Sequence, residues 1–441
     1  MSNTQITTVK PSPKTLDAWL AHIEALHPKS IAMGLDRVQT VVNSLALKPI
    51  IPIITIAGTN GKGSTCAMLE AIYNEAGYRV GCYTSPHLVR YNERVRVNGH
   101  SVKDADLCKA FAEVEAARGE VALTYFEMGT LAAVWHFVQS ALNVVILEVG
   151  MGGRLDAVNV FEPSCAIVTS IDLDHMEYLG DTREKIGFEK AGIYRSAKVA
   201  ICGDENPPNS LIDYAAQIGA NLQLINRDFR GKKSADGWQY EANNIHLNLP
   251  NIQLNLPNLA LHGDFQLNNA ASVVCAVQHL NDVLPVLPTS IDAALRAVTL
   301  MGRFHQVRSN PLIIVDVAHN PQAAKSLAHN LQNTPCAGRT LAVFAMLADK
   351  DIEGVIDALV PHISAWYLAD IHNVRGAKAE YLQQKLQQEL LDQATPINLF
   401  ENVSIALQAA CKDVAKNDRI IVFGSFYTVA EAIKSLNVEA S

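Results

Sequence analysis

The feature that most constrains the fold is a glycine-rich segment directly after an apolar run. Residues 51–57 read Ile-Pro-Ile-Ile-Thr-Ile-Ala, and residues 58–65 continue as Gly-Thr-Asn-Gly-Lys-Gly-Ser-Thr. A buried strand, such a turn and a helix together place backbone N–H groups, a helix N-terminus and one lysine around phosphate groups. The order predicts a nucleotide-binding loop, with ATP chemistry as the leading hypothesis. A glycine-rich surface turn without a ligand is the alternative.

The spacing of this loop differs from the common pattern G-x-x-x-x-G-K-[ST]. Gly63 lies between Lys62 and Ser64, so the segment reads G-x-x-G-K-G-S. A motif of this kind predicts phosphate binding only in the strand–turn–helix context found here. The loop alone therefore leaves the class of nucleotide-using protein open.

The length and net charge of the chain narrow the possible classes of nucleotide-using protein. The chain has 441 residues, more than one hydrophobic core usually serves, so two domains are expected. Lysine and arginine total 36 against 44 aspartates and glutamates, a net charge of −8. This balance, without a long basic run, is poor for binding nucleic acid. We expect small-molecule partners, no nucleic acid or membrane, and a monomer.

The cysteines and the N-terminal residues predict where in the cell the protein is found. The 8 cysteines are scattered without a C-x-x-C pair, which argues against structural zinc and favours reduced core thiols. Residues 1–13 contain no long apolar stretch, so neither a signal peptide nor a membrane anchor is expected there. We expect a cytoplasmic protein.

Strand and helix patterns alternate over the first 200 residues. Strands that are apolar throughout, rather than alternating, are typical of a parallel sheet with helices on both faces. The predicted strands are 53–57, 79–83, 143–149, 166–171 and 198–202, with helices between them such as 126–142. Residues 227–261 alternate polar and apolar positions with prolines, which predicts small antiparallel strands. Helices are expected at 266–280 and 291–300.

A second strand–helix series begins after Gly302. Its predicted strands are 312–317, 341–345, 366–369 and 419–423. The fold class is therefore α/β: an N-terminal parallel-sheet ATP-binding domain over residues 1–300 and a smaller, Rossmann-like C-terminal domain over residues 301–441. We place the boundary near residues 298–304, where the pattern restarts.

Polar residues end three predicted strands, and in open parallel sheets ligands bind at these ends. Glu148 ends the strongest strand, Ser85 follows another, and His175 closes the segment Ser-Ile-Asp-Leu-Asp-His. Magnesium prefers oxygen ligands, so Ser85 and Glu148 suit it better than the His175 nitrogen, which becomes a candidate only in their company. A solvated strand-end carboxylate is the alternative for Glu148.

Further candidates follow the glycine run 150–153, which predicts a close approach of backbone to a ligand or a lid. Arg154 and Asp156 come next and read equally well as surface charges. In the second series, the Arg303 guanidinium could bind phosphate in a bidentate way. Asp316 ends a strand and is expected to face the cleft, while Asn320 and Pro321 are expected to cap the following helix.

Taken together, these motifs resemble the bifunctional dihydrofolate synthase/folylpolyglutamate synthase family of the Mur-ligase-like superfamily. The resemblance runs from about Leu16 to Val429, and the motifs occur in family order. They are GTNGKGST, YTSPHLVRYNERVRVNG, LTYFEMGTLAA, VVILEVGMGGRLDAVN, SIDLDH, EKAGI, GRFHQV, VDVAHNP, MLADKDI and GSFYTV. One departure is the loop 371–376, where relatives often carry a proline before the arginine–glycine pair. This puts the loop's geometry in question.

The resemblance implies a set of site residues. The ATP contacts would be Thr59, Asn60, Gly61, Lys62, Gly63, Ser64, Asn269, Arg303 and Asp316. The magnesium ligands, with two ions expected, would be Ser85, Glu148 and His175. The catalytic groups would be Lys62, Glu148, His175 and Lys190. Lys190 would carry a carboxyl group, although its spacing alone favours a helix-surface lysine.

The pterin part of the substrate would contact three segments: Ile31, Ala32, Met33 and Gly34; Thr124, Tyr125, Phe126 and Glu127; Leu155, Asp156 and Ala157. The segment 123–127 favours the bifunctional type over folylpolyglutamate synthase alone. The implied activity is ATP-dependent ligation of L-glutamate to dihydropteroate, and of further glutamates to reduced folates, through an acyl phosphate.

Two other classes of protein are alternatives. A nucleotide-switched binding protein of the GTPase type needs a guanine-reading N-K-x-D segment, which the sequence lacks. A Mur-type ligase acting on a nucleotide-linked peptide precursor usually carries an additional N-terminal domain, whereas about 50 residues precede the phosphate-binding loop here. This Mur-type ligase is the alternative function.

Overall fold

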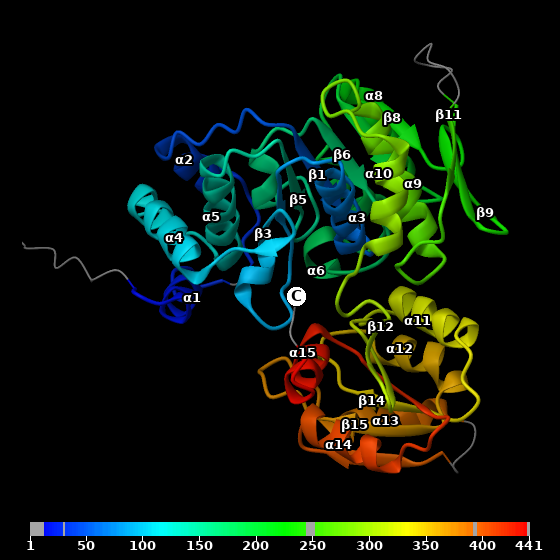
Figure 1. The fold of residues 1–441 in the computed structure, drawn as a ribbon. Coiled ribbons are helices and arrows are strands. Elements are labelled where there is room, and N and C mark those ends of the chain that lie inside the picture. Colours follow the sequence, from blue (N-terminus) through cyan, green and yellow to red (C-terminus); the bar gives the residue numbers. More distant parts are fainter. Residues whose placement is uncertain (1–12, 30, 244–251, 391–394, 439–441) are drawn as a thin grey trace, which may run out of the picture.

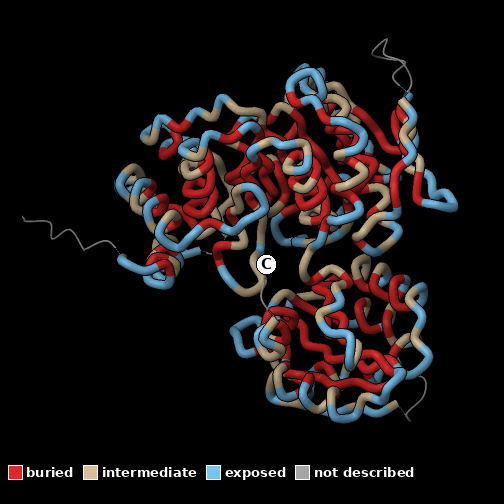
Figure 2. Tube along the Cα trace, viewed as in Figure 1, coloured by how far each residue is buried: buried red, intermediate tan, exposed pale blue. Residues whose placement is uncertain are grey.

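The computed structural model describes residues 13–29, 31–243, 252–390 and 395–438. The predictions for residues 1–12, and for residues 244–251 within the proline-rich stretch, lie outside these ranges. The described chain forms two lobes, each built around its own sheet (Figure 1). Each lobe has a separate set of buried segments, drawn in red in Figure 2. The expected α/β fold with a large sheet and a second, smaller unit is confirmed.

The larger lobe contains an 8-stranded sheet with the order β4-β3-β2-β5-β1-β6-β7-β8. Strands β2, β5, β1, β6, β7 and β8 run parallel, and β3 pairs antiparallel with both β2 and β4. The strands are β1 (Ile53–Ala57), β2 (Val80–Tyr83), β3 (Val95–Val97), β4 (His100–Ser101), β5 (Val144–Glu148), β6 (Cys165–Val168), β7 (Val199–Cys202) and β8 (Asn221–Leu224). The five predicted strands are present within a few residues of their expected bounds.

Helices cover both faces of this sheet, which explains why its central strands β2, β5, β1 and β6 are buried throughout. Ile53 and Ala57 of β1 belong to one hydrophobic cluster, and Ile54 and Ile56 belong to the other. The helices of this lobe are α1 (Leu16–Glu24), α2 (Asp36–Ser44), α3 (Lys62–Glu75), α4 (Asp104–Arg118), α5 (Tyr125–Gln139), α6 (Met176–Leu179), α7 (Arg183–Ala191), α8 (Asn209–Ile218), α9 (Phe265–His279) and α10 (Pro288–Ala297).

A small antiparallel sheet is attached to the larger lobe, as the alternating pattern predicts. Its order is β11-β10-β9, formed by β9 (Phe229–Ser234), β10 (Gly237–Ala242) and β11 (Ile252–Leu256). Trp238 and Tyr240 of β10 are buried in the same hydrophobic cluster as α3 and α9. The sheet therefore extends the core on the side of the phosphate-binding helix.

The smaller lobe contains a 6-stranded sheet with the order β12-β13-β17-β14-β15-β16, of which only β12 is antiparallel among the described strands. The strands are β12 (His305–Ser309), β13 (Leu312–Asp316), β14 (Thr340–Phe344), β15 (Ala365–Ala369), β16 (Ile397–Phe400) and β17 (Arg419–Phe423). The helices are α11 (Pro321–Asn333), α12 (Ile352–Leu359), α13 (Ala379–Glu389), α14 (Val403–Asp413) and α15 (Phe426–Ser435). All four strands predicted for this series are present. No helix in the described ranges is long and apolar enough to cross a bilayer.

Candidate active site

The phosphate-binding loop joins β1 to α3, in the predicted order. Gly58 has a φ of +152° and Gly61 has a φ of +90°, a backbone region that favours glycine. A Cβ added at Gly61 would lie 2.7 Å from the side-chain oxygen of Asn269. The loop can therefore approach Asn269 closely only because position 61 carries no side chain.

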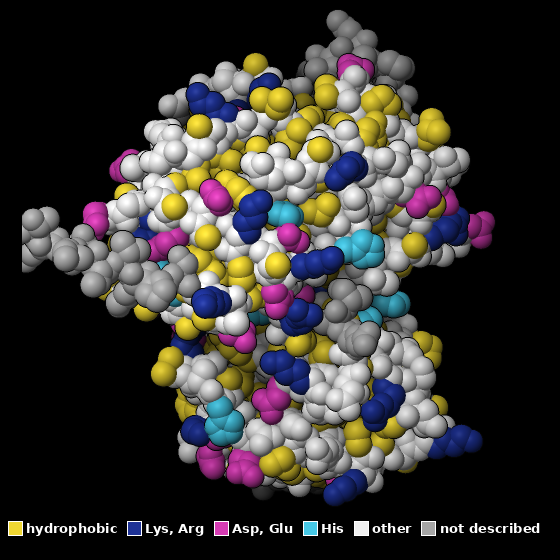
Figure 3. All heavy atoms as spheres, turned by 60° about the vertical axis from the view of Figure 1, so that its left-hand side comes forward, with side chains coloured by type: hydrophobic (Ala, Val, Ile, Leu, Met, Phe, Trp, Pro, Cys, Tyr) yellow, Lys and Arg dark blue, Asp and Glu magenta, His cyan; other side chains and the backbone are white. Residues whose placement is uncertain are grey.

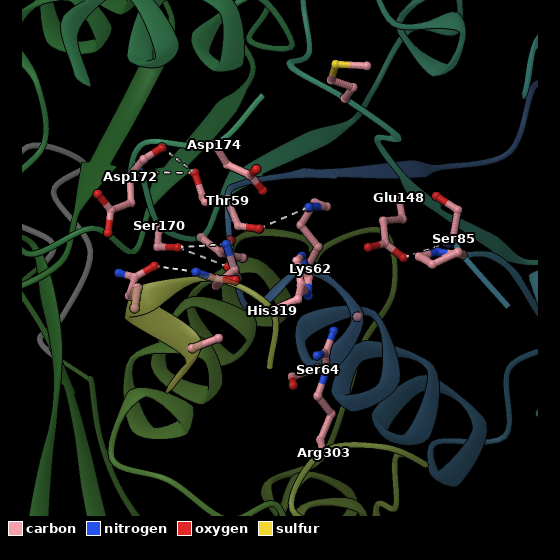
Figure 4. Close-up of a pocket in the computed structure, with 18 of the residues that line it drawn as sticks. Thr59, Lys62, Ser64, Ser85, Glu148, Ser170, Asp172, Asp174, Arg303 and His319 are labelled. Atoms are coloured by element: carbon pink, nitrogen blue, oxygen red, sulfur yellow. Dashed lines mark hydrogen bonds between the residues drawn. The ribbon is translucent and has the colours of Figure 1, made fainter. Parts of the chain in front are cut away.

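The side chains of this loop are held from several directions (Figure 4). Lys62 Nζ donates hydrogen bonds to the carbonyl oxygens of Gly58 at 2.9 Å and Thr59 at 3.3 Å. Thr59 Oγ1 donates to the Asp172 carbonyl oxygen at 3.1 Å. On the helix side, Gln266 Nε2 donates to the buried Ser64 hydroxyl at 3.0 Å. The lysine is thus fixed over its own loop, where it would meet phosphate oxygens.

Glu148 ends β5 as a buried carboxylate, so its interpretation as a solvated strand-end residue is wrong. The Ser85 backbone N–H donates to Glu148 Oε2 at 3.0 Å, which brings these two predicted ligands together (Figure 4). Burial raises the pKa of Glu148, although Lys62 and the Ser85 N–H oppose the rise. A buried acid of this kind suits a divalent cation, because a cation stabilises its charged form.

His175 lines the same cavity but is an exposed residue. It directly precedes α6 and has a left-handed φ of +50°. Burial of part of its ring and the nearby cations lower its pKa, opposed by Asp174, so the neutral imidazole is favoured. Within the described ranges, no group of three or more His, Cys, Asp or Glu side chains forms a metal site. Besides Glu148, the predicted ligands for a metal are Ser85 and His175, and non-protein oxygens would complete the coordination.

Residues of the smaller lobe open toward the same loop. Asp316, at the end of β13, accepts hydrogen bonds from the backbone N–H groups of Phe304 and Ala318, both at 2.8 Å. Arg303 is half-buried, and its guanidinium lies 5.5 Å from the ring centre of Phe426. Asn320 accepts from the Ala323 N–H at 2.9 Å, so its predicted capping of α11 is confirmed.

Most residues of the predicted pterin segments line the same cavity as the phosphate-binding loop. The residues of these segments that line the cavity are Ile31, Ala32, Met33, Thr124, Phe126, Glu127, Leu155, Asp156 and Ala157, whereas Gly34 and Tyr125 do not line it. Thr124 caps α5, and its backbone N–H donates to Glu127 Oε2 at 2.7 Å. Arg37, which the sequence did not single out, forms an ion pair with Glu127 at 2.8 Å.

Asp156 is buried rather than a surface charge, so that alternative is wrong. It accepts hydrogen bonds from the N–H groups of Met151 at 2.9 Å and Val158 at 3.0 Å. Burial raises its pKa to about 7, and these hydrogen bonds limit the rise. The carboxyl can therefore hold or release a proton near neutral pH beside the cavity.

The glycine run has a packing role. A Cβ at Gly150 would lie 2.6 Å from the Phe126 ring, and one at Gly153 would lie 2.8 Å from the Glu189 carbonyl oxygen. Arg154, the next residue, forms an ion pair with Glu189 at 2.8 Å. The glycines therefore let residues 150–153 pack closely against α7. The sequence predicted a close approach to a ligand or a lid here, and did not predict this contact with α7.

Lys190 is also buried, so the prediction of a helix-surface lysine from its spacing is wrong. Burial, reinforced by the Lys62 charge and opposed by Asp174, lowers its pKa to about 7. A lysine with this pKa is partly a neutral amine at physiological pH, and a neutral amine is the form that can react with carbon dioxide.

The Lys190 pKa leads to a pH-dependent stability. Between pH 7 and its unfolded pKa near 10, the unfolded chain binds more protons, so the free energy of unfolding rises with pH in this window. In degassed buffer we expect Lys190→Met to remove a rise of up to about 1.4 kcal/mol per pH unit. Urea unfolding at pH 7, 8 and 9 measures how the free energy of unfolding changes with pH.

Lys185→Met is the control, because Lys185 is an exposed residue of the same helix, and it should leave the rise with pH intact. Equal slopes in the wild type and in Lys190→Met would contradict the lowered pKa of Lys190.

The phosphate-binding loop, Glu148, Asp156, Arg303 and Asp316 line one cavity of about 1230 Å³ between the two lobes, whereas Lys190 does not line it. Charged side chains and histidines gather along the waist between the lobes in Figure 3. The lobes are joined across this waist by an ion pair between Asp174 and Lys350 at 2.8 Å and by hydrogen bonds from Asn60 of the loop to Asn320 and Gln322. The loop that would hold phosphates is therefore in direct contact with the smaller lobe.

Sequence reasoning missed several residues that line the cavity, including Arg94, His319, Lys350 and Ser425. His319, Lys350 and Ser425 follow β13, β14 and β17, which were all predicted as strands. Ligands bind at the ends of parallel strands, and the same argument that singled out Asp316 would have found these residues too. The loop 371–376, where a proline was missing, closes on Asn373 instead: its side chain accepts from the Arg375 N–H at 2.8 Å.

Comparison with known proteins agrees with this arrangement. The pattern of the Mur ligase middle domain matches residues 56–277, and that of the Mur ligase glutamate ligase domain matches residues 302–426. The dihydrofolate synthase/folylpolyglutamate synthase of Escherichia coli (strain K12) is 42% identical over 98% of this chain and 99% of its own. The chain belongs to the dihydrofolate synthase/folylpolyglutamate synthase family. It is therefore an ATP-dependent ligase.

Solved structures of family members show the same fold. E. coli FolC in complex with DHPP and ADP has a TM-score of 0.90 and 42% identity, covering 97% of this chain and 99% of its own. A bifunctional folylpolyglutamate synthase/dihydrofolate synthase with Mn, AMPPNP and L-glutamate bound has a TM-score of 0.87 and 41% identity, covering 97% and 100%. Relatives in this family thus bind a nucleotide and a divalent metal.

Proposed function

We propose that this chain joins L-glutamate to dihydropteroate, forming dihydrofolate, and adds further glutamates to reduced folates. The observation that carries the proposal is the cavity between the lobes, which is lined by the phosphate-binding loop, Glu148, Asp156 and Arg303. A ligase of this type must hold ATP, a carboxylate and an amine together, and a cavity between two lobes can exclude water from them.

The proposed reaction begins at a carboxylate, which is a poor electrophile. The folate carboxylate attacks the γ-phosphate of ATP, and the bond to ADP breaks, leaving an acyl phosphate. Lys62 and Arg303 stabilise the charge on the transferring group. The glutamate amine then attacks the acyl carbon and phosphate leaves, forming the amide. Water kept out of the cavity cannot hydrolyse the acyl phosphate.

Nucleotide contacts are assigned to both lobes. We assign the phosphates to Thr59, Asn60, Gly61, Lys62, Gly63 and Ser64, with Asn269, Arg303 and Asp316 as further contacts. The close approach of Gly61 to Asn269 and the hydrogen bond from Asn60 to Asn320 support this assignment. The proposed domain boundary near residue 301 places Arg303 at the start of the second domain, beside the junction.

A divalent cation is assigned to Ser85, Glu148 and His175, and when bound it would neutralise charge on the phosphates. The buried Glu148 carboxylate supports this site. Lys190 is proposed to be carboxylated and thereby to help position a second ion, supported by its burial and its pKa of about 7. We further propose that the protein is a monomer in the cytoplasm and that its partners are small-molecule substrates alone.

The test compares two substrate pairs. ADP release is measured with dihydropteroate plus L-glutamate and with tetrahydrofolate plus L-glutamate, and the folate products are separated by chromatography. Turnover with both pairs is the expected result. Turnover with the second pair alone would leave only a polyglutamate synthase, and turnover with neither would contradict the proposed function.

A further inference from the structure

Arg96 of β3 holds together segments that are continuous in the chain with the cavity-lining residues Lys62 and Ser85. Its Nη2 donates to Glu70 Oε2 at 2.7 Å, and its Nε donates to the same oxygen at 3.0 Å. Its Nη1 donates to the Thr84 hydroxyl at 3.0 Å and to the Glu93 carbonyl oxygen at 2.9 Å. The side chains of Arg96 and Glu70 are only 16% and 8% exposed, so this is a buried ion pair rather than a surface one.

The partners of Arg96 belong to the two segments that carry the proposed phosphate and metal groups. Glu70 lies on α3, the helix that begins with Lys62. Thr84 immediately precedes Ser85. The Glu93 carboxylate accepts hydrogen bonds from three successive backbone N–H groups of the segment after Ser85, at 2.7, 2.9 and 2.6 Å. One guanidinium therefore ties the Ser85 segment, at both of its ends, to the phosphate-binding helix.

We propose that Arg96 is a positioning residue that fixes Ser85 relative to the phosphate-binding helix and thereby sets the affinity of the nucleotide-bound site for a divalent cation. The inference rests on the proposed function, because it takes Ser85 and Glu148 as metal ligands. The planar guanidinium offers five N–H donors in a fixed arrangement, so it can hold Glu70, Thr84 and the Glu93 carbonyl at once. A lysine at the same place could not.

The test uses Mn²⁺ as the probe cation. The full chain and its Arg96→Gln variant are saturated with ADP and titrated with Mn²⁺, and free Mn²⁺ is followed by electron paramagnetic resonance. We expect the Kd for Mn²⁺ to rise by about tenfold, the scale seen when groups that orient metal ligands are removed. Arg96→Lys keeps the charge without the fork and should show most of the same rise. An unchanged Kd in both folded variants would overturn the proposal.

A matched control distinguishes a positioning role of Arg96 from a general loss of stability. Arg419 is another buried arginine; it donates to the Thr340 hydroxyl at 3.0 Å and to the Leu331 carbonyl oxygen at 2.8 Å, inside the smaller lobe. Arg419→Gln should lower Tm while the Kd for Mn²⁺ stays as in the wild type. An equal rise in Kd in Arg419→Gln and Arg96→Gln would overturn the proposal.

A further variant distinguishes failure of this inference from failure of the proposed function. Glu148→Gln should weaken Mn²⁺ binding at least as much as Arg96→Gln does, because it removes a proposed ligand directly. If Glu148→Gln binds Mn²⁺ normally, the metal site itself is wrong, and the inference fails with it. If only Glu148→Gln weakens binding, the site stands and the positioning role of Arg96 is overturned.

Discussion

Replacing Lys62 with alanine is expected to lower kcat by about 10² or more, the scale of removing one preorganised charge-stabilising donor. The Lys62 amine is held by the carbonyl oxygens of Gly58 and Thr59, so it is already in place when phosphate arrives. The variant loses the cation that would stabilise the transferring phosphoryl group. Substrate binding outside the phosphates is untouched, so the loss should fall on kcat more than on the KM for glutamate.

The measurement is the steady-state rate of ADP release with saturating folate substrate. Lys48→Ala removes an exposed lysine of the same lobe and should keep wild-type turnover, which shows that the effect is not one of overall charge. Near-normal turnover in Lys62→Ala would remove the glycine-rich loop from the site.

The architecture could be predicted from the sequence because buried parallel strands have a strong local signal. The strand Ile53–Ala57 is buried at every position and apolar at all but Thr55, since both of its faces are covered. The missed strands lie at or next to a sheet edge and are short or only partly buried; they are β3, β4, β8, β12 and β16. His305–Ser309 of β12 and Ile397–Phe400 of β16 carry exposed or half-buried side chains, and β3 and β4 are very short. Their pairing depends on neighbours that the local pattern does not reveal.

The site could be predicted only in part, for a related reason. Strand ends locate Ser85, Glu148 and Asp316 because the topology brings such ends to one edge of a sheet. Burial is a property of the packed molecule, so spacing along the chain does not reveal that Lys190 and Asp156 are buried with pKa values of about 7. The contact between Asp174 and Lys350 depends on how the two lobes meet, which spacing along the chain does not determine.

Replacing Glu148 with glutamine is expected to abolish divalent-cation-dependent turnover while the fold remains intact. The glutamine oxygen can still accept the Ser85 N–H hydrogen bond, so the local structure is kept, but the negative charge that a cation needs is lost. ADP release measured against Mg²⁺ concentration should show no activation at any concentration. Undiminished turnover would remove Glu148 from the site.

The same variant has a predicted effect on stability that distinguishes a metal ligand from a structural residue. Burial raises the folded pKa of Glu148, so the folded chain binds more protons than the unfolded chain just above the ordinary glutamate pKa, and its stability falls as pH rises through that window. Without metal at pH 7, Glu148→Gln should therefore have a Tm equal to or above that of the wild type. Glu241→Gln, on the distant β10, should leave turnover unchanged. A lowered Tm in Glu148→Gln would mean that the carboxylate stabilises the fold itself, and the loss of turnover could then no longer be assigned to a missing metal ligand.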